Sequence, residues 1–158
     1  MKRGFTLIET IVYAAILAVL SVAVIATILS MTSAFAKAKI LRRLTLDAET
    51  VLERVSRDAR SASAVDDAAS VLNASSSRLS LDTGNNFYIS GGRVAFQQNG
   101  GVVDYLTSPT SSTTSFFVTK ITTARSEAVK IQLTLSAGSG EGQITRSFFS
   151  TVILRGSY

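Results

Sequence analysis

The feature that most constrains the fold of this chain is a long run without charge near its start. From Thr10 to Ala36 the sequence contains no Asp, Glu, Lys or Arg. This run is longer than the roughly 20 residues that an α-helix needs to cross a bilayer. The rest of the chain, taken alone, has the composition of an ordinary polar globular domain. The sequence therefore predicts one membrane-spanning helix followed by a modest domain.

The composition also limits the chemistry that this domain can perform. The chain has 158 residues, no Cys and no His, so it lacks thiols, disulfides and the commonest general base and metal ligand. Its formal net charge of +5 is mild and does not require a nucleic-acid partner. We therefore expect no enzyme, no catalytic residue, no cofactor and no small-molecule substrate.

Two familiar interpretations of the first forty residues meet difficulties. A secretory signal peptide would use Lys2 and Arg3 as its basic start and 34–36 as its cleavage site. Its apolar core, however, would far exceed the usual length of about 7 to 15 residues. A plain single-pass anchor has a suitable length, but Glu9 opposes it. A carboxylate at the centre of the apolar zone costs about 2.5–3.5 kcal/mol, and less near the interface.

A third interpretation accounts for Glu9 together with the glycine before it. The sequence "GFTLIE", within a match from about Lys2 to Leu29, resembles the class III signal of type IV pilins and type II secretion pseudopilins. That family has a short basic leader ending in Gly, then an aromatic or apolar residue, and an acid at the fifth mature position. The resemblance implies that a prepilin peptidase cuts between Gly4 and Phe5 and methylates the new N-terminus on Phe5. We favour this interpretation.

The resemblance also implies a role for Glu9 in assembly. Cleavage would leave an α-ammonium on Phe5, and Glu9 would lie one helical turn further along the same face, about 6 Å up the axis. A buried charge is tolerable when it is paired. In the family, this acid pairs with the terminal amine of a neighbouring subunit and sets the axial register. From the sequence, pairing of Glu9 with its own Phe5 amine and protonation of Glu9 both remain open.

Location and partners follow from the same resemblance. The chain would be a single-pass protein of the cytoplasmic (inner) membrane with an extracytoplasmic C-terminal domain, and later part of a filament. Its partners would be prepilin peptidase, other pilin or pseudopilin subunits, an assembly platform protein and the membrane. Counting basic side chains on both sides of the apolar run would place the segment after this run in the cytoplasm, because that segment carries more of them than the leader does. These are Lys37, Lys39, Arg42 and Arg43. The motif requires the leader inside, and we follow the motif.

A single long helix is predicted over residues 5–62, after a leader at residues 1–4. The chain has no Gly between the leader and Gly84, and its only Pro is Pro109. Residues 5–36 are apolar on every face. Over residues 37–62 the apolar positions recur at spacings of three and four: Leu41, Leu44, Ala48, Val51, Leu52, Val55 and Ala59. We expect this stripe to hold the globular domain.

Beyond a connecting loop at residues 63–77, the apolar period falls to two. This period predicts about six or seven antiparallel strands over residues 78–158, with "RLSL", "FYIS", "RVAF", "VVDYL" and "VKIQLTL" among them. Residues 108–115 are expected to form a polar loop. The last strand, from about Gln143 to Leu154, has apolar residues at positions for both faces, which favours a bulge or burial on both sides.

Together these elements predict an α+β fold in which a long N-terminal helix packs on a C-terminal antiparallel β-sheet. The pilin resemblance implies the same architecture. The loop, the meander and the final "VILRG" are similar to minor pseudopilins of the J type and to minor pilins, although Gly156 stands where those proteins often have Asn. A membrane-anchored binding module that never polymerises is the competing class. An enzyme tethered to the envelope is the third class.

Two groups of charged residues outside the signal are weaker candidates for binding. Asp66 and Asp67 form an acidic pair that could contribute to a Ca²⁺ site, but a solvated surface pair is the favoured interpretation, so we predict no metal site. A basic face for DNA would need four side chains to gather, and scattered solvated charges are favoured over DNA as a partner. Those side chains are Lys120, Arg125, Lys130 and Arg146.

Overall fold

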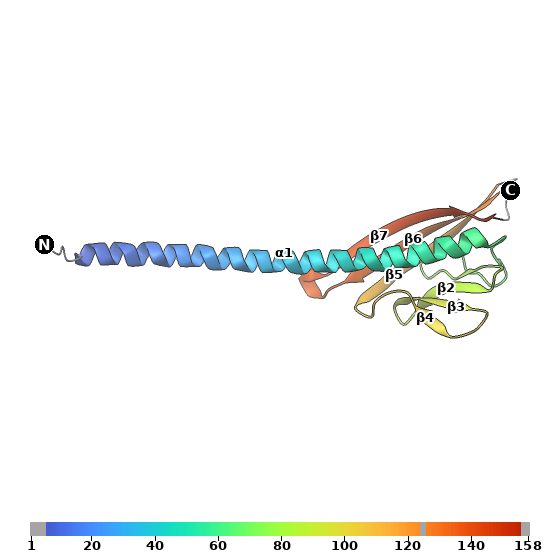
Figure 1. The fold of residues 1–158 in the computed structure, drawn as a ribbon, viewed down its shortest axis with the longest axis horizontal. Coiled ribbons are helices and arrows are strands. Elements are labelled where there is room, and N and C mark those ends of the chain that lie inside the picture. Colours follow the sequence, from blue (N-terminus) through green and yellow to red (C-terminus); the bar gives the residue numbers. More distant parts are fainter. Residues whose placement is uncertain (1–5, 124–125, 156–158) are drawn as a thin grey trace. The chain divides into compact units, whose positions relative to one another are not determined.

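A single helix, α1, runs from Leu7 to Ser61 in the computed structural model, which describes residues 6–123 and 126–155 (Figure 1). The prediction of one helix over residues 5–62 is therefore confirmed over nearly all of its length, while Phe5 lies outside the described residues. The chain divides into two compact units, Met1–Lys39 and Ile40–Tyr158, and α1 contributes to both.

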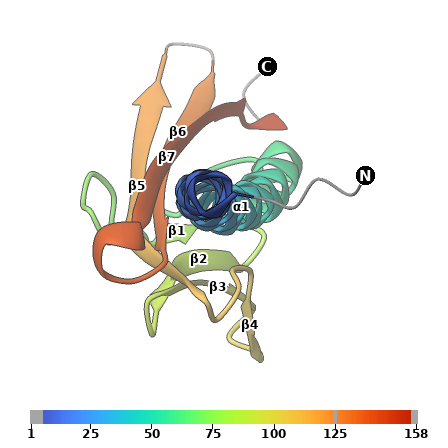
Figure 2. The ribbon, with the colours of Figure 1, turned by 90° about the vertical axis from the view of Figure 1, so that its left-hand side faces the viewer.

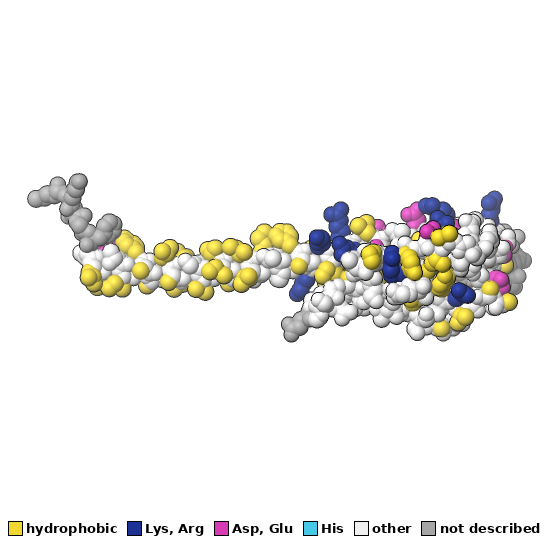
Figure 3. Space-filling model, turned by 90° about the horizontal axis from the view of Figure 1, so that it is seen from below, with side chains coloured by type: hydrophobic (Ala, Val, Ile, Leu, Met, Phe, Trp, Pro, Cys, Tyr) yellow, Lys and Arg dark blue, Asp and Glu magenta, His cyan; other side chains and the backbone are white. Residues whose placement is uncertain are grey.

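In the first unit, the described part of α1 carries its side chains in the open. Every residue from Thr6 to Lys39 is exposed except Glu9, which is half-buried. Figure 3 shows hydrophobic side chains along this stretch of the helix. A helix that is apolar on all faces is stable only when lipid or other helices surround it.

In the second unit, α1 buries one stripe. Leu44, Ala48, Val51, Val55 and Ala59 are fully buried, while Leu41 and Leu52 are half-buried. The predicted stripe is confirmed, with one addition that the apolar pattern did not show. Asp58 lies next to Ala59 on the buried side and is only 8% exposed.

The described residues contain seven strands in two antiparallel sheets. The first sheet has the order β1 (Leu79–Ser80), β2 (Asn85–Ser90), β3 (Arg93–Gln98) and β4 (Val103–Tyr105). The second has β5 (Ser111–Thr122), β6 (Glu127–Ala137) and β7 (Ile144–Ile153), with a short 3₁₀ helix, η1 (Gly140–Gly142), before β7. The α+β class and the number of strands are confirmed. The strands form two sheets, however, where one was expected.

The loop before β1 explains why the second sheet stops at β5. The backbone N–H groups of Asn73 and Ser77 donate to the carbonyls of Val118 and Phe116, and the Phe116 N–H donates to the carbonyl of Ser75. These bonds occupy the outer edge of β5. Figure 2 shows β5, β6 and β7 on one side of the second half of α1, and β2 and β3 on another.

The predicted polar loop at residues 108–115 is wrong from Ser111 onward, because β5 begins there. Its first inward-facing side chains, Ser111 and Thr113, are polar yet buried, so the strand has no apolar alternation at this end. Pairing with β6 makes these residues a strand, and a register shift between Thr113 and Ser115 marks the irregular start.

The last strand, β7, also corrects an expectation. Its register with β6 is unbroken from Ile144 to Ile153, so it carries no bulge. Nor is it buried on both faces, because Phe149 is 61% exposed and Ile153 is 51% exposed. The two faces differ because only the side that faces the core is covered. Val152 on that side is buried, as are its neighbours on β6.

The core of the second unit lies between α1 and the inner faces of both sheets. Its largest fully buried side chains include Phe87, Phe116, Leu44, Leu79, Leu81, Ile131, Leu133, Leu135 and Leu154. The hairpin between β2 and β3 turns through Gly91 and Gly92, whose φ angles of 56° and 71° suit glycine. The predicted glycine turn is thereby confirmed.

A polar network also ties the helix to the first sheet. Asp58 Oδ2 accepts hydrogen bonds from Arg54 Nε at 3.2 Å and from Asn85 Nδ2, at the start of β2, at 3.1 Å. The Arg54 guanidinium lies 4.3 Å from the centre of the Phe96 ring on β3. One buried carboxylate therefore binds groups from α1 and β2, and Arg54 extends the network to β3.

We expect Asp58→Ala to destabilise the globular unit by about 1–3 kcal/mol, because the Asn85 amide would lose its acceptor in a buried position. Urea unfolding of the full chain in detergent, followed by the β-sheet circular dichroism, measures the change. Asp104→Ala removes an exposed carboxylate from β4 and serves as the control. Equal effects of the two substitutions would contradict a structural role for the Asp58 network.

Candidate functional site

The candidate site is the first turn of α1, which carries Glu9. Thr6 immediately precedes the helix, and its Oγ1 accepts a hydrogen bond from the Glu9 backbone N–H at 3.4 Å, so Thr6 caps the N-terminus. An acidic side chain in a first turn also interacts favourably with the helix dipole. Of the predicted site residues, the structure describes Glu9, whereas Gly4 and Phe5 lie outside the described residues.

Glu9 has a side-chain partner on its own helix. The Tyr13 hydroxyl donates a hydrogen bond to Glu9 Oε1 at 3.3 Å. Sequence reasoning missed Tyr13, although positions four apart share a helix face and the spacing alone would have indicated the contact. The site therefore contains a carboxylate and a phenol, one helical turn apart, within the apolar run.

The smaller hydroxyl side chains of this run make a different contact. Five of the six Ser and Thr side chains donate a 2.8 Å hydrogen bond to a backbone carbonyl three or four residues earlier in α1. These residues are Thr10, Ser21, Thr27, Thr32 and Ser33. Such bonds satisfy hydroxyl groups within the helix, as a segment surrounded by lipid requires.

By length and composition, α1 can cross a membrane, and its most apolar window is entirely exposed. No comparable second helix occurs in the described part of the chain. The arrangement is thus a membrane-compatible helix with a single acidic residue close to its start.

Comparison with protein families matches residues 1–25 to the prokaryotic N-terminal methylation motif. This chain carries a prepilin-type N-terminal signal. The match contains Gly4, Phe5 and Glu9. Searches of curated proteins and of solved structures returned no match to the chain.

The prepilin signal precedes a pilin-like α+β architecture, in which one long apolar N-terminal helix packs on antiparallel sheets. The signal and the architecture are both consistent with a single-pass membrane anchor. Pilin-type proteins are structural rather than catalytic, so the signal directs attention to assembly contacts.

The described basic residues do not form the face that was considered for DNA. Lys120 pairs with Val129 across the sheet, Arg146 with Leu135, and Lys130 with Thr151. Because Val129 and Leu135 point to the core face, Lys120 and Arg146 lie on that side and Lys130 on the other. Lys120 also binds Asp67 at 2.8 Å and Glu127 at 3.1 Å. Arg125 lies outside the described residues.

The acidic pair of the connecting loop is engaged within the chain. Asp66 Oδ1 accepts hydrogen bonds from the backbone N–H groups of Ala68 and Ala69, at 3.0 and 3.2 Å, while Asp67 binds Lys120. Within residues 6–123 and 126–155, no group of three or more His, Cys, Asp or Glu side chains could hold a metal ion.

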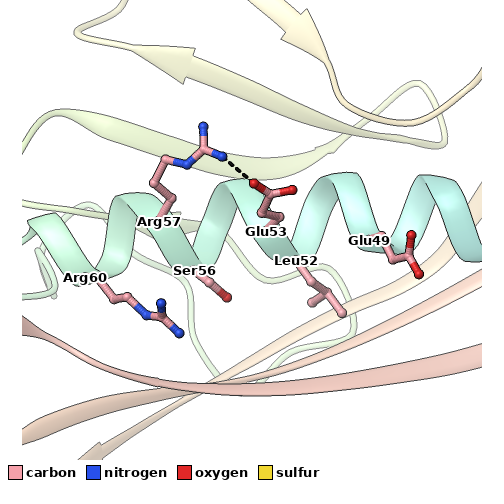
Figure 4. A pocket seen from close by; sticks show the side chains of 6 residues that line it. All are labelled: Glu49, Leu52, Glu53, Ser56, Arg57 and Arg60. Atoms are coloured by element: carbon pink, nitrogen blue, oxygen red, sulfur yellow. Dashed lines mark hydrogen bonds and ion pairs between the residues drawn. The ribbon is translucent and has the colours of Figure 1, made fainter.

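A hollow of about 670 Å³ lies along an exposed flank of α1 in the second unit (Figure 4). It is lined by Glu49, Leu52, Glu53, Ser56, Arg57 and Arg60. Glu53 and Arg57 form an ion pair across one helical turn, and both side chains are well exposed. Exposed pairs of this kind contribute little to stability. The hollow is an open, charged surface without a paired nucleophile and base.

The Lys120 contacts predict a pH dependence of stability. Its hydrogen bond to Asp67, supported by Glu127 and opposed by burial, raises the pKa of Lys120 above the ordinary value of 10.5. When folding raises the pKa of a lysine, the lysine contributes its full stabilisation at pH values below its pKa in the unfolded chain. This contribution is lost as the pH rises through its pKa in the folded chain.

Below about pH 10.5 we therefore expect the unfolding free energies of the native chain and of Lys120→Arg to change in parallel with pH. Above about pH 10.5 the unfolding free energy of the native chain should fall relative to that of Lys120→Arg. Arginine keeps its charge throughout this range, so the difference between the two chains isolates Lys120 from other groups that titrate. Urea unfolding at several alkaline pH values provides the measurement. A difference that stays constant to about pH 12 would refute the assignment.

Proposed function

We propose that this chain is a structural subunit, of the minor class, of a type IV pilus or a type II secretion-like pseudopilus. The observation that carries the proposal is the prepilin signal at residues 1–25, continuous with the exposed apolar half of α1. The pilin-like α+β architecture supports it. Prepilin peptidase cleaves between Gly4 and Phe5 and methylates Phe5, while α1 anchors the subunit in the cytoplasmic membrane.

Assembly then moves α1 from lipid to a bundle of neighbouring helices. An assembly platform protein delivers the subunit, and the exposed apolar side chains of α1 pack against other pilin or pseudopilin subunits. Glu9 selects the register of this packing. An unpaired carboxylate in an apolar medium is costly, so the arrangement in which Glu9 meets the Phe5 amine of a neighbour is favoured over shifted arrangements.

The minor class rests on sequence features of both ends. Many major pilins carry a helix-bending Pro at the twenty-second mature position, where this chain has Ala26. The final strand and "VILRG" are similar to minor pseudopilins of the J type. The domain after α1 is extracytoplasmic, and the subunit ends in the pilus or pseudopilus filament.

Processing is tested at the cleavage site. We expect Gly4→Leu to abolish removal of Met1–Gly4, because a bulky side chain obstructs the peptidase at the scissile bond. Gel mobility and intact mass of the membrane-bound protein report cleavage and methylation. Ala14→Leu adds a similar side chain elsewhere on α1 and should be processed normally. An unchanged mature mass in Gly4→Leu would overturn the peptidase step.

Assembly is tested at Glu9. We expect Glu9→Gln to be processed and anchored normally but to enter filaments at least about tenfold less, because the neighbouring ammonium loses its carboxylate. Co-isolation with other prepilin-like subunits is the measurement, and Glu49→Gln, on the open flank of α1, is the control. If the native chain co-isolates with no such subunit, a membrane-anchored binding module becomes the better description.

A further inference from the structure

Glu9 and Tyr13 are two polar side chains that satisfy each other inside an otherwise apolar stretch. The Tyr13 hydroxyl donates to Glu9 Oε1 at 3.3 Å, and the Tyr13 side chain is 56% exposed. Nearby hydroxyls turn back to the helix, as the 2.8 Å bond from Thr10 Oγ1 to the Leu7 carbonyl shows. Tyr13 is distinguished by a hydroxyl that reaches a charged side chain.

The length of the tyrosine side chain explains the difference. The hydroxyl groups of serine and threonine lie next to their own backbone and can reach a carbonyl in the preceding turn. The phenol oxygen lies at the far end of a rigid ring, and the ring of a helical residue lies over the preceding turn. In Tyr13 this direction brings the hydroxyl to the side chain four residues earlier, which is Glu9.

The contact leaves Glu9 able to accept a second partner. A carboxylate has two oxygens with about four acceptor positions. Tyr13 donates to Oε1, and among the described residues no other side chain donates to this carboxylate, so Oε2 could accept from an ammonium group.

We propose that Tyr13 is a positioning residue for the assembly contact of Glu9. It stabilises the Glu9 side chain in lipid before the subunit meets its neighbour, and it holds Oε1 so that Oε2 receives the terminal amine. This inference rests on the proposed filament function, because it assigns a partner to Glu9 within that function.

The first test concerns the contact alone and does not depend on assembly. The full mature chain is placed in lipid nanodiscs, with Tyr88, Tyr105 and Tyr158 replaced by phenylalanine so that Tyr13 is the only tyrosine. The ultraviolet resonance Raman doublet of tyrosine reports whether its hydroxyl donates. We expect a donor signature that is lost with Glu9→Leu, whose side chain has no acceptor, and stays unchanged with Thr10→Val. A signature insensitive to Glu9→Leu would overturn the proposal.

The second test measures assembly through a double-mutant cycle. We expect Tyr13→Phe to be processed and anchored normally but to enter filaments about threefold less, the usual effect of one side-chain hydrogen bond inside a bilayer. In a Glu9→Gln background, Tyr13→Phe should have no further effect, because its influence passes through the carboxylate. Thr10→Val deletes a nearby hydroxyl that donates to the Leu7 carbonyl instead of to Glu9, and it is the matched control.

The outcomes distinguish the positioning role of Tyr13 from the filament function and from the assembly role of Glu9. Equal losses from Tyr13→Phe with and without Glu9 would show that Tyr13 acts only through packing, and would overturn its positioning role while leaving the filament function intact. Normal incorporation of Glu9→Gln would overturn the assembly role of Glu9 itself. A threefold loss that vanishes in the Glu9→Gln background, together with the Raman change, would establish Tyr13 as the positioning residue.

Discussion

The organisation of this protein depends on one carboxylate in an apolar helix. Glu9 lies at the start of a run that has no further charge until Lys37. Water stabilises such a group, and lipid does not, so the chain must supply partners. The Thr6 cap fixes the backbone of the first turn, and Tyr13 supplies a hydrogen-bond donor within the helix. The remaining acceptor capacity of Glu9 is the basis of the contact with a cationic terminus that we propose.

The same helix meets two different environments. Its first half exposes apolar side chains on every face, which suits lipid or neighbouring helices. Its second half buries a single stripe against the sheets and directs charged residues outward. The change occurs without any break in the helix, because the backbone hydrogen bonds are local and only the side chains differ. The chain can thus join a membrane anchor to a folded domain without a linker.

Polar contacts complete the domain, which has no disulfide. Asp58 joins α1 to β2 through Asn85, and Asp67 and Glu127 hold Lys120 at the side of the second sheet. The loop at residues 73–77 covers the edge of β5 with backbone hydrogen bonds. Edge strands left open are prone to pair with other chains, so this loop limits growth of the sheet on that side.

By itself, the sequence determined the features that depend on near neighbours in the chain. The helix, its buried stripe and the glycine hairpin follow from spacing over a few residues, since helix faces and turns are local properties. The prepilin signal is a short motif that was identified by its resemblance to a family. The contact between Tyr13 and Glu9 could also be predicted from the sequence, because the two residues lie one helical turn apart. Only the tertiary structure decided the start of β5, where buried Ser111 and Thr113 hide the strand pattern. It also decided the burial of Asp58, the division into two sheets and the separation of Lys130 from Lys120. These features arise from groups far apart in the chain, and their polar side chains gain partners only when the elements pack together.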